Sequence, residues 1–252
     1  MRQLVILSGK GGTGKTSVAA ALAHLASLEM PIVLADADVD AANLELVLAP
    51  NKLEEHVFMG GQVAVIDPEL CQLCGRCYEV CRFEAIIPSD DTYRVDPLAC
   101  EGCASCIHQC PEEAIHGEEQ QAGLWFRSDT RFGPLFHAHL FAAQENSGRL
   151  VTEPTVSGVH DLERILGTVN HFRVPALVLI NKADVNPAQA ASIEAYCRAR
   201  GIALVGKLPY DTVVTEAMIQ GQPVTLYQPE GAMARALREV WAQVRKRLNG
   251  AR

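Results

Sequence analysis

Cysteine spacing constrains this chain more than any other feature of its sequence. Eight of its nine cysteines lie between Cys71 and Cys110, and the ninth is Cys197. The eight form two runs of the pattern C-x-x-C-x-x-C-x-x-x-C, the second starting 29 residues after the first. Structural disulfides of secreted proteins are spread along a chain, whereas cysteines this close together are typical of metal ligands. The pattern predicts a metal centre in a reducing, cytoplasmic protein, with Cys197 as a buried apolar residue.

The doubled run resembles that of the bacterial ferredoxins that hold two 4Fe–4S clusters. In that family three cysteines of each run bind one cluster, and the fourth cysteine binds the other. The resemblance implies two ligand sets: Cys71, Cys74, Cys77 and Cys110 for one cluster, and Cys100, Cys103, Cys106 and Cys81 for the second. A zinc site would use four ligands at a time and would not need the third cysteine of each run. The first run departs from the family in one place, because Arg82 rather than proline follows Cys81.

A glycine-rich loop near the start of the chain is the second motif. Residues 9–16, Gly-Lys-Gly-Gly-Thr-Gly-Lys-Thr, match the pattern G-x-x-x-x-G-K-S/T between an expected buried strand at 4–7 and an expected helix at 17–28. In such loops backbone N–H groups point at phosphate oxygens, the last lysine binds the β- and γ-phosphates, and the final hydroxyl can bind Mg²⁺. The expected nucleotide-binding residues are Gly11, Gly12, Thr13, Gly14, Lys15 and Thr16. The sequence therefore predicts a nucleoside triphosphate site with Mg²⁺.

The additional lysine in this loop, Lys10, makes it resemble the deviant phosphate loop of the MinD/ParA and nitrogenase iron protein class. In that class the first lysine reaches across a dimer interface to the partner's nucleotide, so the resemblance implies an ATP-dependent homodimer with Lys10 acting in trans. Asp36 and Asp38 follow the next apolar run, where the family has its first switch segment. The resemblance assigns Asp36 to the outer coordination sphere of Mg²⁺ and Asp38 to orienting the attacking water. The alternative is an exposed acidic turn.

A third motif, Asn-Lys-Ala-Asp at 181–184, follows an apolar run at 176–180. Taken alone it is similar to the N-K-x-D element of GTPases, in which the aspartate reads guanine. In the MinD-like class the asparagine at this strand end contacts adenine, and the segment around Pro209 resembles that family's second base-binding loop. We therefore expect Asn181 and Pro209 to bind adenine. Guanine binding and a helix-capping turn without a ligand are the alternatives.

Short apolar runs alternate with helical segments along the rest of the chain. The expected strands are at 31–35, 176–180 and 202–205, the expected helices are at 159–169, 188–200 and 231–248, and an expected hairpin joins 124–126 to 134–141. This order predicts an α/β fold: a P-loop NTPase-like domain at 1–59 and 118–252, with a mostly parallel sheet and helices on both faces. Short strands and turns are expected from residue 60 on, in an inserted bacterial-ferredoxin-like α+β domain at 60–117. The last helix is expected to cover the sheet and not to bind a membrane.

One element of a complete ATPase of this class is absent from the sequence. In chains that resemble this one, a helix, a strand ending in D-G-P-P-G and another helix stand between segments like 144–149 and 151–155. Here the two segments adjoin. The connection at 141–149 is also shorter than the dozen residues that a parallel crossover needs. ATP hydrolysis, the second switch and the intact central sheet are therefore open, but the phosphate loop and the cysteine ligands are unaffected.

Composition limits the partners that the chain can have. It carries 22 Lys and Arg against 30 Asp and Glu, a net charge of −8, which argues against nucleic acid or an anionic membrane as the partner. His137 and His139 share a strand face, but no third metal ligand is in view and a structural role is favoured.

These observations lead to one expected function and two alternatives. We expect a nucleotide-dependent switch coupled to electron transfer through two 4Fe–4S clusters, acting with an unidentified redox or iron–sulfur acceptor protein. The alternatives are a cluster scaffold or carrier ATPase, and a nucleotide-binding ferredoxin that does not hydrolyse ATP.

Overall fold

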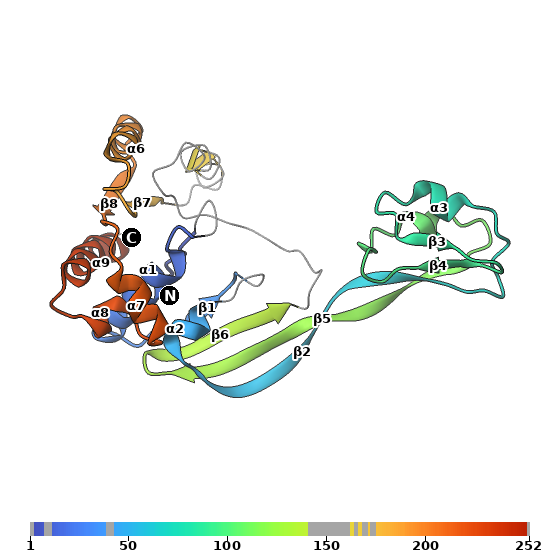
Figure 1. The fold of residues 1–252 in the computed structure, drawn as a ribbon, viewed down its shortest axis with the longest axis horizontal. Helices are drawn as coiled ribbons and strands as arrows, with labels where there is room; N and C mark the ends of the chain where they lie inside the picture. Colours follow the sequence, from blue (N-terminus) through green and yellow to red (C-terminus); the bar gives the residue numbers. More distant parts are fainter. Residues whose placement is uncertain are drawn as a thin grey trace. The chain divides into compact units, whose positions relative to one another are not determined.

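The computed structural model describes residues 3–7, 12–38, 43–140, 162–163, 166–167, 171 and 175–250 (Figure 1). The chain divides into two compact units. The first comprises Met1–Glu54, Phe126–His137 and Asn146–Arg252, and the second comprises Glu55–Trp125 and Ala138–Glu145. The insert expected at 60–117 lies inside the second unit, and its limits stay a prediction.

The first sheet contains four strands in the order β1-β6-β5-β2. Its members are β1 (Leu34–Asp36), β2 (Asn51–Ile66), β5 (Ile115–Thr130) and β6 (Gly133–Leu140). β1 and β6 run parallel, which places Asp36 opposite His137. At the turn between β5 and β6 the hydroxyl of Thr130 donates to the carbonyl of Gly133 over 2.7 Å. The expected hairpin is therefore confirmed, and β5 is much longer than the sequence indicated.

A second, parallel sheet contains β7 (Leu177–Ile180) and β8 (Ala203–Lys207), with α6 (Pro187–Ala199) between them in the chain. These elements confirm the strands and the helix expected in this region to within two residues. Cys197 on α6 is 1% exposed and packs in an apolar cluster with Ile193, which confirms its predicted role.

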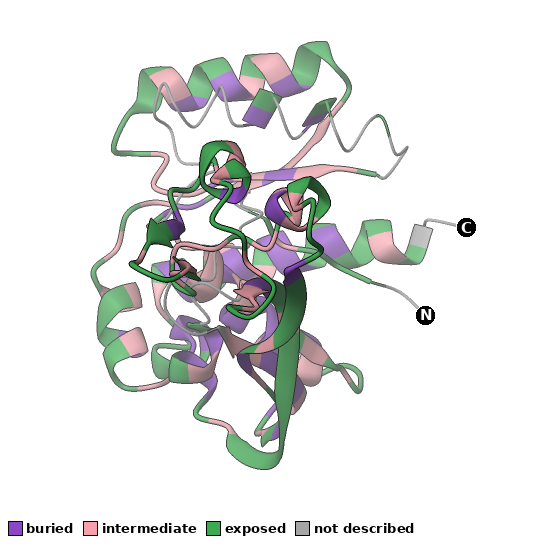
Figure 2. Cartoon of the chain, turned by 90° about the vertical axis from the view of Figure 1, so that its right-hand side faces the viewer, coloured by how far each residue is buried: buried purple, intermediate pink, exposed green. Residues whose placement is uncertain are grey.

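The remaining helices of the first unit surround its largest apolar core. They are α1 (Lys15–Ser27), α2 (Leu44–Leu48), α7 (Val213–Ile219), α8 (Val224–Tyr227) and α9 (Ala232–Gly250). α1 contacts α2, α8 and α9. The apolar stripe of α9 is buried against this core, through Met233, Leu237, Val240, Trp241 and Val244, and Figure 2 shows buried positions along the helix that leads to the C-terminus. The packing role predicted for this helix is therefore confirmed.

The expected strand at 4–7 is wrong. Residues 3–7 form no strand, and Leu4, Val5 and Leu7 are 39%, 61% and 44% exposed. A β-strand forms only where another strand lies along one of its edges and exchanges backbone hydrogen bonds with it. Among the described strands, β1 and β7 belong to different sheets, so the single, mostly parallel sheet expected from the sequence is not formed by this part of the chain. No described strand pairs with this apolar run.

Two other expectations differ from the structure in detail, and a third is largely untested. The strand expected at 31–35 covers only Leu34–Asp36. The short strands expected from residue 60 are replaced at their start by β2, a single 16-residue strand that passes through both glycines there. The helix expected at 159–169 falls largely outside the described residues. Within the described ranges, no helix has the length and apolar composition needed to cross a bilayer.

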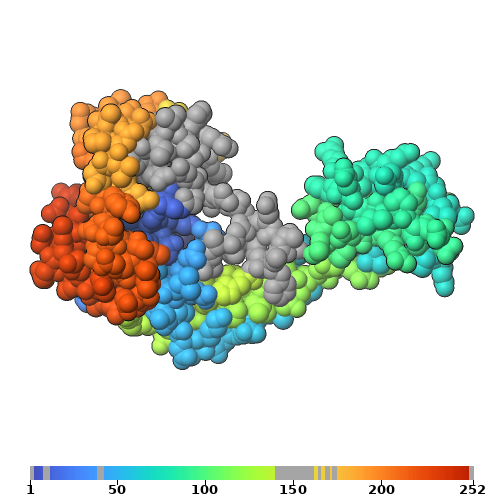
Figure 3. Space-filling model, viewed as in Figure 1, coloured from blue at the N-terminus to red at the C-terminus, as the bar shows by residue number. Residues whose placement is uncertain are grey.

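The second unit contains the same local pattern twice. Its short elements are α3 (Arg76–Val80), β3 (Ile86–Pro88), β4 (Tyr93–Val95) and α4 (Ser105–Gln109). Residues just before α3 and α4 adopt the left-handed conformation, Gly75 at φ 78° and Ala104 at φ 61°. Figure 3 shows this unit in the teal and green of consecutive residues. The 29-residue repeat of the sequence is therefore also a repeat of backbone structure.

Matching hydrogen bonds support the same conclusion. The N–H of Cys71 donates to the carbonyl of Asp67 over 3.1 Å, and the N–H of Cys100 donates to the carbonyl of Asp96 over 3.0 Å. At the other end of each repeat the sulfurs of the fourth cysteines accept N–H groups four residues later: Ala85 to Cys81 over 3.4 Å and Ala114 to Cys110 over 3.3 Å. Each of these bonds has its counterpart 29 residues away.

Candidate functional site

The described part of the phosphate loop starts at Gly12 and leads directly into α1. Gly12 and Gly14 have φ values of 81° and 89°, a left-handed conformation that glycine adopts without steric cost. A β-carbon at Gly14 would also collide with the side-chain amide of Asn181. The pattern of glycines is thus required by backbone conformation and by close approach of a second segment. Lys10 and Gly11 lie outside the described residues.

The segment after β7 is bonded to this loop through its side chains. Asn181 Nδ2 donates to the carbonyl of Thr13 over 2.7 Å, and Lys182 Nζ donates to the carbonyl of Gly12 over 2.9 Å. Thr13 is 1% exposed. The structure therefore brings together two motifs that are about 170 residues apart in the sequence, as a shared nucleotide site requires. No motif in the sequence indicates that Lys182 supports the phosphate loop.

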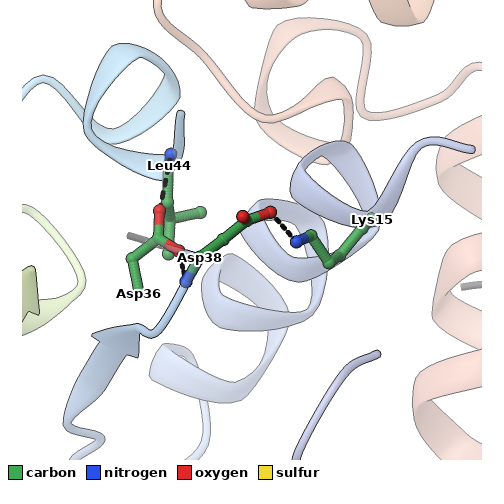
Figure 4. A network of polar contacts seen from close by, with 4 residues as sticks. All are labelled: Lys15, Asp36, Asp38 and Leu44. Atoms are coloured by element: carbon green, nitrogen blue, oxygen red, sulfur yellow. Dashed lines mark hydrogen bonds and ion pairs between the residues drawn. The ribbon is translucent and has the colours of Figure 1, made fainter. Parts of the chain in front are cut away.

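The two aspartates that follow β1 have different roles in the polar network of Figure 4. The carboxylate of Asp38 forms an ion pair with the ammonium of Lys15. Asp36 accepts two backbone N–H groups, from Asp38 and from Leu44, each over 3.1 Å. Burial raises the pKa of Asp36, and the Leu44 hydrogen bond and the charge of Lys15 offset only part of this effect. Asp36 is thus hydrogen-bonded to backbone groups that follow it in the chain, whereas the Asp38 carboxylate is paired with the phosphate-loop lysine.

A cavity of about 590 Å³ opens beside these groups. This volume lies within the range of about 300–1,000 Å³ that is usual for small-molecule sites. The residues that line it include Gly12, Thr13, Gly14, Lys15, Thr16, Asp38, Asn181, Lys182, Pro209, Tyr210 and Asp211. The predicted base-binding residues Asn181 and Pro209 therefore line the same cavity as the phosphate loop. An apolar wall that includes Met218 and Leu237 was not expected from the sequence.

The cysteine residues of the second unit gather in a separate place. Cys81, Cys100, Cys103 and Cys106 line one small cavity, together with apolar residues such as Ile86 and Val95. Cys77 and Cys106 are buried, Cys74 and Cys103 are exposed, and the other four are intermediate. The exposed pair and the buried pair are each 29 residues apart. The fourth cysteine of the first run thus lies with the first three of the second run, as the ferredoxin pattern requires.

Hydrogen bonds and burial act on the sulfurs in opposite directions. Burial raises the pKa of the Cys77 and Cys106 thiols. At Cys71 burial also acts upward, but hydrogen bonds from the N–H of Leu73, the hydroxyl of Thr92 and the N–H of Tyr93 together lower its pKa.

At Cys103 hydrogen bonds to Ser105 lower the pKa, with a contribution from the charge of Arg82. The four sulfurs of Cys81, Cys100, Cys103 and Cys106, which line one cavity, fit the ligand chemistry of a 4Fe–4S cluster, and the second set of four stays a prediction.

His137 lies on β6, between β1 and β5 in the sheet, and is 3% exposed. Its Nδ1 is 3.2 Å from the carboxylate of Glu45, its Nε2 is 2.9 Å from the hydroxyl of Ser128, and its ring stacks on Phe126. The sequence did not predict Glu45 at this position, because α2 is short and has no motif. These contacts pack His137 among its neighbours, and they place beside it a carboxylate, Glu45, that the sequence analysis did not have in view.

Comparison with known proteins places the chain among nucleotide-binding domains. The pattern of the CobQ/CobB/MinD/ParA nucleotide binding domain matches residues 4–224. An uncharacterised protein of Methanocaldococcus jannaschii is 30% identical over 226 residues, covering 73% of this chain and 79% of that protein. An uncharacterised ATP-binding protein of the same organism is 25% identical over 247 residues, covering 96% and 86%.

Solved structures show the same relationship at the level of fold. MinD from Pyrococcus horikoshii, complexed with Mg-ADP, has a TM-score of 0.52 and 20% identity, covering 94% of this chain and 93% of that one. The cell division ATPase MinD of Pyrococcus furiosus also has a TM-score of 0.52 and 20% identity, covering 96% and 97%. The predicted α/β P-loop NTPase fold of the MinD type is confirmed. This chain belongs to the CobQ/CobB/MinD/ParA family of nucleotide-binding domains.

Proposed function

We propose that this chain is an ATP-binding iron–sulfur protein in which the nucleotide state of the phosphate loop controls electron transfer through two 4Fe–4S clusters. The observation that carries the proposal is the combination of two sites in one chain: a phosphate-loop cavity, and eight cysteines in two matched runs. Lys15 and Thr16 line this cavity, which supports a triphosphate with Mg²⁺ as its occupant. A MinD relative of known structure was obtained with Mg-ADP, which supports the choice of nucleotide and ion.

Contacts at the base-binding end of the cavity favour adenine over guanine. In GTPases the aspartate of the N-K-x-D element must offer its carboxylate to the guanine ring. Here Asp184 accepts the N–H of Tyr210 over 2.6 Å, and the described cavity lining includes Asn181 and Pro209 but not Asp184. An aspartate held in this way is poorly placed to read guanine. The nucleotide is therefore ATP or ADP.

Three residue roles in the proposal come from the family resemblance. Lys10 would act on the nucleotide of the partner in an ATP-bound homodimer, Asp36 would support Mg²⁺ from outside its ligand sphere, and Asp38 would orient water. When bound, the clusters supply one-electron redox chemistry. The buried cysteines Cys77 and Cys106 support clusters that stay in place, and so favour electron transfer over delivery of the cluster as cargo.

The proposal is tested on protein purified without oxygen. Iron and acid-labile sulfide are counted first, and about eight of each per chain are expected for two clusters. The rate at which the dithionite-reduced chain transfers electrons to an artificial acceptor is then measured with and without MgATP. Lys15→Ala should keep the iron and lose the response to ATP, whereas Lys246→Ala, an exposed lysine of α9, should behave like the native chain.

Three outcomes would contradict parts of the proposal. Iron near zero would remove the clusters from it. Loss of both clusters to an apo-acceptor protein in repeated transfer assays would favour the carrier function. A chain that carries about eight irons but binds no nucleotide in calorimetry would be a ferredoxin that ATP does not control.

A further inference from the structure

Two histidines of β6 lie beside a glutamate of α2. His137 and His139 are two residues apart on one strand, so their side chains leave the same face of it. One nitrogen of each histidine and one carboxylate oxygen of Glu45 all lie within 4.8 Å of one another. From the sequence alone this pair of histidines had no third metal ligand, and α2 supplies one.

The separation of the ligand atoms suits a bound metal ion. The Nδ1 of His137 is 3.2 Å from the carboxylate of Glu45. A tetrahedral Zn²⁺ ion with nitrogen and oxygen ligands holds neighbouring ligand atoms about 3.4 Å apart. His139 is at most 4.8 Å from either of the others, a gap that rotation of its partly exposed side chain can close.

The surroundings of His137 hold its ring in the orientation that a ligand needs. Its Nε2 lies 2.9 Å from the hydroxyl of Ser128, which is fully buried, and its ring stacks on Phe126. Histidines that bind metals usually donate the N–H of the second ring nitrogen to such a partner, which fixes the tautomer and the direction of the ring. With Nε2 on Ser128, Nδ1 is the nitrogen that is presented to Glu45.

Backbone contacts position Glu45 in turn. Asp36 accepts the N–H of Leu44, the first residue of α2 and the neighbour of Glu45, over 3.1 Å (Figure 4). β1 pairs with β6 so that Asp36 is opposite His137. The strand pairing and this hydrogen bond therefore bring the start of α2 to the histidine.

The described charges near these groups are of both signs. Glu45 and Asp36 contribute two carboxylates. Lys15 is paired with Asp38, and the exposed Lys52 lies 3.7 Å from the centre of the ring on which the buried histidine stacks. The only cation in this set without a carboxylate of its own among these groups is thus exposed to solvent, which weakens its opposition to a bound ion.

The composition of the group indicates which ions it can hold. Imidazole suits zinc, copper, iron and nickel, whereas Mg²⁺ and Ca²⁺ prefer sets made of oxygen alone. Zinc sites with two histidines and one glutamate leave a fourth position, which water or a substrate takes. Glu45 is 20% exposed and His139 is partly exposed, so an ion can reach the group from solvent.

We propose that Glu45, His137 and His139 form a binding site for a divalent transition-metal ion of the Zn²⁺ type. None of the three is among the described residues that line the nucleotide cavity, and none belongs to the cysteine runs. The inference therefore goes beyond the proposed function and does not depend on it. Ser128 acts through His137 and is a positioning residue.

The test measures Zn²⁺ binding to the untagged chain, purified without oxygen and kept free of nucleotide. Equilibrium dialysis against Zn²⁺ gives the number of ions and their affinity, and iron and sulfide are counted on the same samples. X-ray absorption at the zinc edge then identifies the ligands, because Zn–N and Zn–O distances are about 2.0–2.2 Å and Zn–S distances about 2.3 Å. This absorption is selective for zinc, so cluster iron does not interfere.

Glu45→Gln and His139→Ala should each lose one zinc ion per chain, and that ion should have only nitrogen and oxygen ligands. Excess Mg²⁺ should not displace it. Ser128→Ala should keep the same ligands and bind zinc about 10–100-fold more weakly, as expected when the partner of a metal-bound histidine is removed.

A second histidine–glutamate pair provides the matched control. His116 and Glu118 are 3.3 Å apart and exposed, and they belong to no group of three ligands among the described residues. His116→Ala and Glu118→Gln should therefore bind zinc like the native chain.

The inference is overturned if Glu45→Gln and His139→Ala bind as much zinc as the native chain with the same affinity. It is also overturned if the zinc that they lose has sulfur ligands, or if excess Mg²⁺ displaces it. A chain without iron contradicts the proposed function and leaves this comparison intact, because zinc on free cysteines is common to the native chain and the variants.

Discussion

Replacing Asp38 with asparagine tests the nucleotide site through its central ion pair. In the structure Lys15 is paired with the Asp38 carboxylate, and their side chains are 21% and 30% exposed. A nucleotide phosphate must take the Lys15 ammonium from this partner before it can bind. The Asp38 carboxylate also repels a triphosphate that enters the same cavity.

The magnitude follows from the exposure of the pair. Ion pairs this accessible to solvent contribute up to about 1 kcal/mol, which corresponds to about a fivefold change in a dissociation constant. Asp38→Asn should therefore bind ATP and ADP up to about fivefold more tightly when Mg²⁺ is removed. The gain should shrink as salt is added, because salt screens partly exposed charges.

The assay is a calorimetric titration with ATP in EDTA at low and at physiological salt. Asp129→Asn, an exposed aspartate on β5 outside the cavity lining, is the matched control and should bind like the native chain. The Lys15→Ala variant shows the calorimetric signal that is expected when ATP binding is lost. If Asp38→Asn binds ATP more weakly than the native chain without Mg²⁺, then Asp38 helps to hold the nucleotide, and the reasoning from the ion pair is refuted.

Three further predictions follow from single positions. Gly14→Ala should abolish nucleotide binding in the same titration, because the left-handed backbone and the Asn181 amide leave no room for a β-carbon; retained binding would contradict this. Cys197→Ser should lower the free energy of unfolding by about 1–3 kcal/mol, since it buries a hydroxyl among apolar residues, while the iron content stays native. A hydrogen bond with Arg245 lowers the pKa of Glu29, so this contribution to stability is present above the ordinary pKa of 4.5 and is lost as pH falls through the lower folded value. Urea unfolding at pH 7 and near pH 3 should show a smaller loss for Glu29→Gln than for the native chain, and equal losses would argue against the pair.

The cysteine pattern can be recognised in the sequence for a local reason, and the clusters that it implies stay a prediction. Ligand spacing is fixed by a tight loop and a short helix, so it can be read from a few consecutive residues. The repeat of hydrogen bonds at Asp67 and Asp96 is local in the same way. The phosphate loop was equally readable, because its glycines are dictated by their own backbone angles.

Failures occurred where structure depends on distant partners. The apolar run at 4–7 satisfies the pattern of a buried strand, yet a strand forms only where a neighbour offers hydrogen bonds, and no described strand pairs with this run. β2 was missed over its first half because residues 51–59 are all exposed and show no alternation between apolar and polar positions. The hydrogen bond from the Tyr210 N–H to the Asp184 carboxylate joins two segments that are far apart in the sequence, and no sequence pattern predicts it.

Control of electron transfer by the nucleotide state can be measured on the reduced, fully iron-loaded chain. The rate at which this chain passes electrons to an acceptor is compared with and without MgATP, in the native chain and in Lys15→Ala. MgATP should change the rate in the native chain and have no effect in Lys15→Ala. Equal rates with and without MgATP, in a native chain that binds the nucleotide and carries both clusters, would contradict the proposed function.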